Sequence, residues 1–121
     1  MATLSVAKLK PGTTPTLTAY IDGEAIQDAT VYITINMGDT RLTKSNYMND
    51  ESVMVEPVYQ GSRQVGTNII VQYSQAETLC LRPGYASIEA GWVFEDGEAD
   101  KTEIGRIRIS KTLYRGVMLY G

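Results

Sequence analysis

The sequence has no histidine and only one cysteine, and these two shortages exclude much of protein chemistry. Histidine is the commonest general base and metal ligand, so the usual arrangements of Ser or Cys nucleophile, base and orienting residue cannot be built. The single cysteine, Cys80, cannot form a disulfide within the chain, which favours folding in a reducing compartment. Because Cys80 stands between Leu79 and Leu81, we expect a small apolar core residue rather than a reactive thiol. The composition therefore indicates a protein that is not an enzyme.

Long apolar runs are also missing. No segment approaches the roughly 18 apolar residues needed to span a bilayer, and Met1 to Lys10 lacks the apolar stretch of a signal peptide. We therefore expect neither a secreted nor a membrane-embedded protein. With 121 residues, 43% hydrophobic and 21% charged, the chain has the composition of one globular domain, spanning residues 1–121.

The charges are separated along the sequence, although the net charge is only −3. Residues 85–100 contain five acids and no base, whereas residues 101–121 contain five bases and one acid. Two adjacent segments of opposite sign favour pairing, either within one hairpin or between copies of the chain.

Short segments of alternating apolar and polar residues dominate the chain and predict β-strands. The clearest is Ala29–Asn36, in which Val31, Ile33 and Ile35 share one face and every second residue faces the other way. About seven or eight such strands at this spacing predict an all-β antiparallel sandwich. The predicted strands are Thr3–Leu9, Thr16–Asp22, Ala29–Asn36, Thr40–Ser45, Ser52–Val58, Thr67–Tyr73, Tyr85–Phe94 and Thr102–Ser110.

Two of these strands carry the marks of a sheet edge. Leu42 is the only large apolar residue of Thr40–Ser45, and Pro57 withholds a backbone donor from Ser52–Val58. We expect a polar connection over Gly61–Gly66 after the second of them. In Thr102–Ser110, Ile104 is out of phase with the apolar residues that follow, so either a bulge lies near Gly105 or Ile104 packs on the outer face.

A capping box predicts the one helical turn of the chain. In Ser74-Gln75-Ala76-Glu77 the serine hydroxyl accepts from the amide three residues on, while the glutamate reaches back. We expect a single turn near residues 75–79, ended before Pro83.

The remaining chemical motifs fail on inspection. Asp96, Glu98 and Asp100 alternate as in the first half of a calcium loop, but Lys101 stands where the loop needs glycine, which favours a solvated hairpin turn. Neither a phosphate-binding glycine loop nor a Gly-Lys-Ser/Thr motif is present. Arg106 and Arg108 share a strand face without interleaved aromatics, which disfavours nucleic acid as a partner. We expect no metal, cofactor or small-molecule substrate.

Several short segments, taken in order, resemble one family. They are Pro11-Gly12-Thr13-Thr14-Pro15-Thr16-Leu17, the strand Ala29–Ile35, Leu42-Thr43-Lys44-Ser45, Tyr73-Ser74-Gln75-Ala76-Glu77-Thr78-Leu79, Gly84, Asp96-Gly97 and Leu113. This order resembles small tailed-phage and prophage proteins that are similar to the immunoglobulin-like N-terminal domain of the phage baseplate upper protein. The resemblance covers about residues 10–118 and departs from the family at Tyr73, where the family has leucine. It implies an immunoglobulin-like β-sandwich and a place in the tail, the baseplate or another part of a virion. The family brings no catalytic residues.

We therefore expect a structural component of a tailed-bacteriophage particle, made in the cytoplasm of the bacterial host and located in the virion. Its expected partners are other virion proteins or copies of itself, and residues 111–121 form a candidate partner-docking tail. The candidate assembly contacts are Arg106, Arg108, Lys111, Tyr114, Arg115, Met118, Leu119 and Tyr120.

The alternative is a carbohydrate- or host-surface-binding β-sandwich module. That function requires the tyrosines Tyr32, Tyr47, Tyr59 and Tyr85 to line one open patch.

Overall fold

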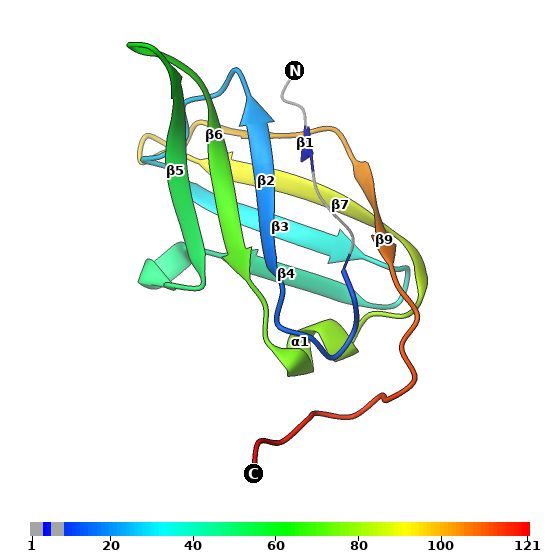
Figure 1. Cartoon of the computed structure of the whole chain (residues 1–121). Helices are drawn as coiled ribbons and strands as arrows, with labels where there is room; N and C mark the ends of the chain where they lie inside the picture. The colour runs from blue at the N-terminus through cyan, green and yellow to red at the C-terminus, as the bar shows by residue number, and fades with distance from the viewer. Residues whose placement is uncertain (1–3, 6–8) are drawn as a thin grey trace.

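Two antiparallel sheets are stacked face to face in the structure, a computed structural model that describes residues 4–5 and 9–121 (Figure 1). The strand order of the first sheet is β1 (Leu4–Ser5), β2 (Thr16–Asp22), β6 (Arg63–Gln72) and β5 (Val53–Gln60). In the second sheet, β4 (Arg41–Ser45), β3 (Thr30–Asn36) and β7 (Gly84–Val93) follow one another, and both β8 (Ala99–Lys101) and β9 (Gly105–Ile109) pair with the other side of β7. Of the predicted first strand Thr3–Leu9, Thr3 and residues 6–8 lie outside the described residues.

The strand order is that of an immunoglobulin fold. In immunoglobulin lettering, β1, β2 and β3 are strands A, B and C, β4 is C′, β5, β6 and β7 are D, E and F, and β8 and β9 together are G. The two sheets then have the orders A-B-E-D and C′-C-F-G. Leu9 then joins the start of the chain to the second sheet, because its N–H donates to the Arg108 carbonyl at 3.0 Å and its carbonyl accepts from Ser110 at 2.9 Å. The predicted all-β, immunoglobulin-like antiparallel sandwich is confirmed.

The core lies between the sheets and follows the alternation of the sequence. Successive side chains of a strand point to opposite faces, so every second residue of the central strands enters the interior. Fully or almost fully buried residues include Leu17, Ala19 and Ile21 of β2, Val31, Ile33 and Ile35 of β3, Ile69 and Val71 of β6, Ala86, Ile88, Ala90 and Trp92 of β7, and Ile107 and Ile109 of β9. Both predicted edges are correct, since β4 and β5 each end a sheet.

A bulge divides the predicted strand Thr102–Ser110, which begins in the structure only at Gly105. Lys101 pairs with Gly91 and Gly105 with Ile88, so residues 102–104 lie opposite only residues 89–90 of β7. Thr102 bridges the irregularity, because its N–H donates to the Ala90 carbonyl at 2.9 Å and its hydroxyl accepts from the Ala90 N–H at 3.1 Å. Ile104 is 70% exposed on the outer face. Both alternatives that the sequence left open are therefore present together.

The predicted connection over Gly61–Gly66 is wrong, because most of it belongs to strand β6. Strands β5 and β6 form one long hairpin in which Gln60 pairs with Arg63 across a two-residue turn. Gly61 has a φ of 66°, the left-handed conformation that tight hairpin turns require. The polar residues that resembled a loop lie on a ribbon where solvent reaches the side chains, so a strand there needs no apolar alternation.

The predicted helical turn is α1 (Gln75–Leu79), and its capping box is complete. Ser74 Oγ accepts from the Glu77 N–H at 3.2 Å, and Glu77 Oε1 accepts from the Ser74 N–H at 2.8 Å. Lys44 Nζ of β4 also donates to the Glu77 carboxylate at 2.9 Å. Burial alone would raise the pKa of Glu77, but the hydrogen bonds from Ser74 and Lys44 outweigh it and lower the pKa below its usual value.

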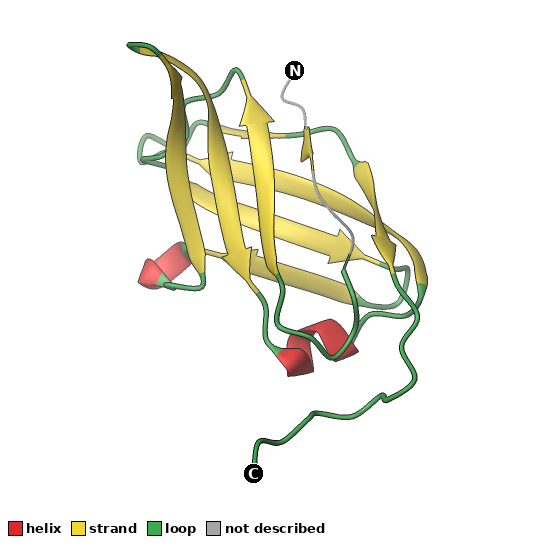
Figure 2. Cartoon of the chain, in the orientation of Figure 1, coloured by secondary structure: helices red, strands yellow, loops and turns green. Residues whose placement is uncertain are grey.

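Helix α1 closes one end of the sandwich, as Figure 2 shows, and a second short helix, η1 (Tyr47–Asn49), follows β4. The buried Thr78 hydroxyl accepts from the Gly12 N–H at 3.0 Å and donates to the Thr13 carbonyl at 2.8 Å. Cys80, predicted to be a core residue, is instead exposed. A helical turn rotates each successive side chain by about 100°, so Thr78 faces inward while Cys80 faces solvent, whatever the polarity of its neighbours.

Candidate assembly surface

Residues 111–121, called the arm below, leave β9 without regular secondary structure and run below α1 (Figure 1). Three of the apolar side chains are almost entirely in solvent, with exposed fractions of 103% for Leu113, 91% for Leu119 and 107% for Tyr120. Tyr114, Val117 and Met118 are about half exposed or more. The arm is therefore an apolar segment that its own chain leaves uncovered.

The arm nevertheless contacts its own chain through polar groups. The Met118 N–H donates to Gln75 Oε1 at 2.7 Å, and Gln75 Nε2 donates to the Met118 carbonyl at 3.1 Å. The Arg115 guanidinium donates to the Leu81 carbonyl at 3.3 Å. The backbone of the arm also comes close to Gly12, where a Cβ would lie 3.8 Å from the Gly116 carbonyl oxygen.

Three of the predicted bases form a basic cluster, defined as Arg106, Arg108 and Lys111. Arg106 and Arg108 are exposed on the outer face of β9, and the Arg106 guanidinium lies 4.3 Å from the centre of the Tyr85 ring. Arg108 and Lys111 line a shallow hollow of about 470 Å³ together with Tyr85. The eight predicted contact residues thus form two groups: the basic cluster, which consists of two residues of β9 and the first residue of the arm, and the arm residues Tyr114, Arg115, Met118, Leu119 and Tyr120 near α1.

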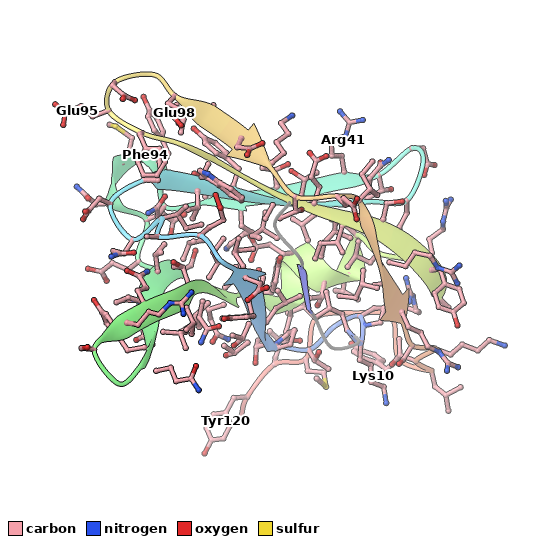
Figure 3. The ribbon with its side chains drawn as sticks, turned by 90° about the horizontal axis from the view of Figure 1, so that it is seen from above. Lys10, Arg41, Phe94, Glu95, Glu98 and Tyr120 are labelled. Carbon is pink, nitrogen blue, oxygen red and sulfur yellow. The ribbon has the colours of Figure 1, made fainter. Side chains whose placement is uncertain are left out.

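Strand β7 forms a hairpin with β8 and β9, called the β7 hairpin below. The acids gather at its turn, at the opposite end from the basic cluster. Glu95, Asp96 and Glu98 line a hollow of about 480 Å³ with Asp28 and Phe94. Figure 3 shows Phe94, Glu95 and Glu98 at one end of the molecule and Lys10 at the far corner. Among the described residues, no group of three or more Asp, Glu or Cys side chains is placed to hold a metal ion.

The opposed charges are mostly not paired within the hairpin. Arg106 lies opposite Ser87 and Arg108 opposite Tyr85, so neither base has an acid directly across the strands. Across residues 4–5 and 9–121, the single ion pair between the two charge blocks joins Lys101 and Glu89 at 3.8 Å. The molecule therefore carries an acidic end and a basic end.

The four tyrosines weighed for glycan binding do not line one patch. Tyr32 lies opposite Gly91 on the outer face of the second sheet, and Tyr85 lies six residues before Gly91 on β7, about 20 Å away. Tyr59 belongs to β5 of the other sheet. This arrangement does not provide the continuous aromatic surface that the alternative function requires.

The sequence does not identify two residues of this surface. Gln75 belongs to the predicted capping box, and nothing local relates it to Met118, which is 43 residues away. Tyr85 is a candidate for glycan binding in the sequence, and the signal for its place here is its alternation with Arg106 and Arg108 on paired strands, which puts the three side chains on one face.

No protein-family model matches the chain, and no curated protein matches it. In the part of the chain that the structure describes, no helix has the length and apolar character to cross a membrane. A function must therefore be inferred from the fold, the arm and the charges.

Proposed function

We propose that this protein is a non-enzymatic structural component of a tailed-bacteriophage particle that acts through protein–protein assembly. It is made in the host cytoplasm and located in the virion, in the tail, the baseplate or another position. The observation that carries this proposal is the exposed apolar arm. The sequence resemblance to phage and prophage proteins supplies the biological setting.

The arm favours assembly because its exposure is costly for an isolated chain. Soluble monomers rarely expose contiguous apolar patches larger than a few hundred Å², and larger ones mark interaction surfaces. The arm concentrates Leu113, Leu119 and Tyr120 in one short segment without covering them. Contact with another subunit would remove this surface from water, at about 25 cal/mol for each Å² buried.

The distribution of charge supports the same function. The acidic hollow around Phe94 and the basic cluster lie at opposite ends of the β7 hairpin. Complementary patches on neighbouring subunits steer association and fix orientation. Other virion proteins and copies of this chain are the partners that such patches suit, and we propose no catalytic, metal or cofactor site.

Particles purified from cells that produce the encoding phage test the proposal by mass spectrometry. We expect the full-length chain in the particles, whereas a chain truncated after Ser110 remains folded by circular dichroism and is absent from them. A matched full-length variant, with Leu113, Leu119 and Tyr120 all changed to serine, should be absent as well. Particles that lack the wild-type chain, or that incorporate the truncated chain equally well, would contradict the proposal.

A further inference from the structure

Gln75 holds the arm in the way that a neighbouring β-strand would. Its side-chain amide offers one acceptor and one donor, and these pair with the N–H and the carbonyl of the same residue, Met118, at 2.7 and 3.1 Å. This contact recognises the backbone of an extended segment. The site therefore accepts such a segment irrespective of which copy of the chain supplies it.

The surroundings of Gln75 complete a docking site for residues 115–118. Arg115 donates to the carbonyl of Leu81, two residues after the end of α1, at 3.3 Å. Gly12 lies beside the arm, where an added Cβ would be in ordinary van der Waals contact, at 3.8 Å, with the Gly116 carbonyl oxygen. The docking site thus consists of Gln75 and the Leu81 carbonyl.

Occupation of this site by the arm of the same copy is weakly favoured. The three hydrogen bonds of Arg115 and Met118 are all near the surface and must offset the ordering of the whole arm. Leu113, Leu119 and Tyr120 contribute almost nothing, because they stay in solvent. The contact within one chain therefore leaves most of the binding potential of the arm unused.

The connection between β9 and the docking site permits exchange. Ser110 is fixed by its hydrogen bond to Leu9, and Arg115 is the next residue of the arm with a hydrogen bond to the described part of the chain. The four residues between them, 111–114, span up to about 14 Å when extended. Exchange of an identical element keeps its contacts unchanged, so it costs little, and a second copy at the α1 end would cover the apolar side chains.

We propose that the docking site of one copy receives the arm of a second copy, with Met118 of the incoming arm paired to Gln75. This inference rests on the proposed function and adds the partner, a second copy of the chain, and the site. Contact with a second copy then removes Leu113, Leu119 and Tyr120 from solvent while the three hydrogen bonds are retained.

Two full-length variants with complementary defects test the exchange. Gln75→Ala disables the docking site and leaves the arm intact, whereas Arg115→Ala combined with Met118→Pro disables the arm and leaves the docking site intact. In sedimentation velocity we expect wild-type chains to self-associate and each variant alone to associate at least about tenfold more weakly. An equimolar mixture should associate more strongly than either variant alone, because the intact arm of one variant meets the intact docking site of the other, and native mass spectrometry should find complexes with one copy of each variant. Gln60→Ala, a glutamine change on the distant β5, should associate like wild type.

The outcomes separate this inference from the proposed function. Wild-type chains that stay monomeric at millimolar concentration, or a mixture that restores nothing, would overturn the exchange. If such chains were still found in purified particles, assembly would stand and the arm would bind a different protein. Circular dichroism checks that each variant is folded, and Gln75→Glu, which keeps the acceptor and loses the donor, provides a milder second variant.

Discussion

The core and the arm are both apolar, yet the sequence places them in opposite environments. Ile33 of β3 is completely buried, whereas Leu119 of the arm is 91% exposed. Ile33 belongs to an alternating strand with partners on both sides, so its face meets the opposite sheet. The arm follows the last strand and has no strand partner of its own. Apolar composition thus buries a residue only where the chain provides a complementary face, and an uncovered apolar segment indicates a partner outside the chain.

The largest expected effect separates these two regions directly. Ile33→Ala should lower the free energy of unfolding by about 2–5 kcal/mol, because it leaves a cavity between the sheets. Leu119→Ala should change it by less than about 0.5 kcal/mol, because that side chain packs against nothing. Urea unfolding followed by tryptophan fluorescence of Trp92 measures both. A large loss for Leu119→Ala would show that the arm belongs to the core.

Loss of a hydrogen bond should lower the free energy of unfolding more in the core than in the arm. Thr102→Val removes the buried hydroxyl that accepts from the Ala90 N–H and should cost about 1–3 kcal/mol of unfolding free energy. Thr102→Ser keeps a hydroxyl and should cost less. Gln75→Ala breaks the polar contact of the arm and should cost less than about 0.5 kcal/mol in the monomer. Equal losses for Thr102→Val and Gln75→Ala would remove the distinction.

The pH dependence should report on α1, where the two regions meet. Glu77 has a pKa below its ordinary value of 4.5, so its ionised form is favoured in the folded protein. Its contribution is therefore complete above the ordinary pKa and is lost as the pH falls through that value to the folded pKa. Glu77→Gln keeps a side chain that can complete the capping box but removes the charge that pairs with Lys44, so it should cost up to about 1 kcal/mol at pH 7. It should also flatten this acid-side loss in urea unfolding measured from pH 6 to pH 3. Lys44→Gln keeps the Glu77 carboxylate and its hydrogen bond from Ser74, so part of the acid-side loss should remain.

The smallest effect is expected beside the arm. Cys80→Ser should change the free energy of unfolding by less than about 0.5 kcal/mol, since the thiol is exposed and donates only a weak hydrogen bond to the Ala76 carbonyl. Thiol reagents should label Cys80 in the folded protein without denaturant. Labelling that required unfolding would place Cys80 back in the core.

The sequence predicted those features that depend on neighbouring residues. Alternation over Val31, Ile33 and Ile35 is a local pattern with a period of two, so it identified β3 and its buried face. The capping box is equally local, and so is the proline that marks β5 as an edge strand. The composition of residues 111–121 also predicts a partner-docking tail; their apolar side chains are exposed, and the docking itself stays a prediction.

The features that were missed depend on contacts between distant residues. Alternation does not reveal that Thr102 replaces a backbone acceptor for Ala90, or that β6 begins as early as Arg63. The environment of Cys80 depends on the orientation of a helical turn against the sandwich. The docking of Met118 on Gln75 depends on how the whole chain folds back on itself, so only the structure reveals it.

The parallel bridge between Leu9 and Ile109 has a mechanical consequence. The arm leaves β9 at Ile109, and there the chain is held on two sides, by Gly84 of β7 and by the hydrogen bonds of Leu9 to Arg108 and Ser110. A load applied to the arm is therefore shared between β7 and the start of the chain.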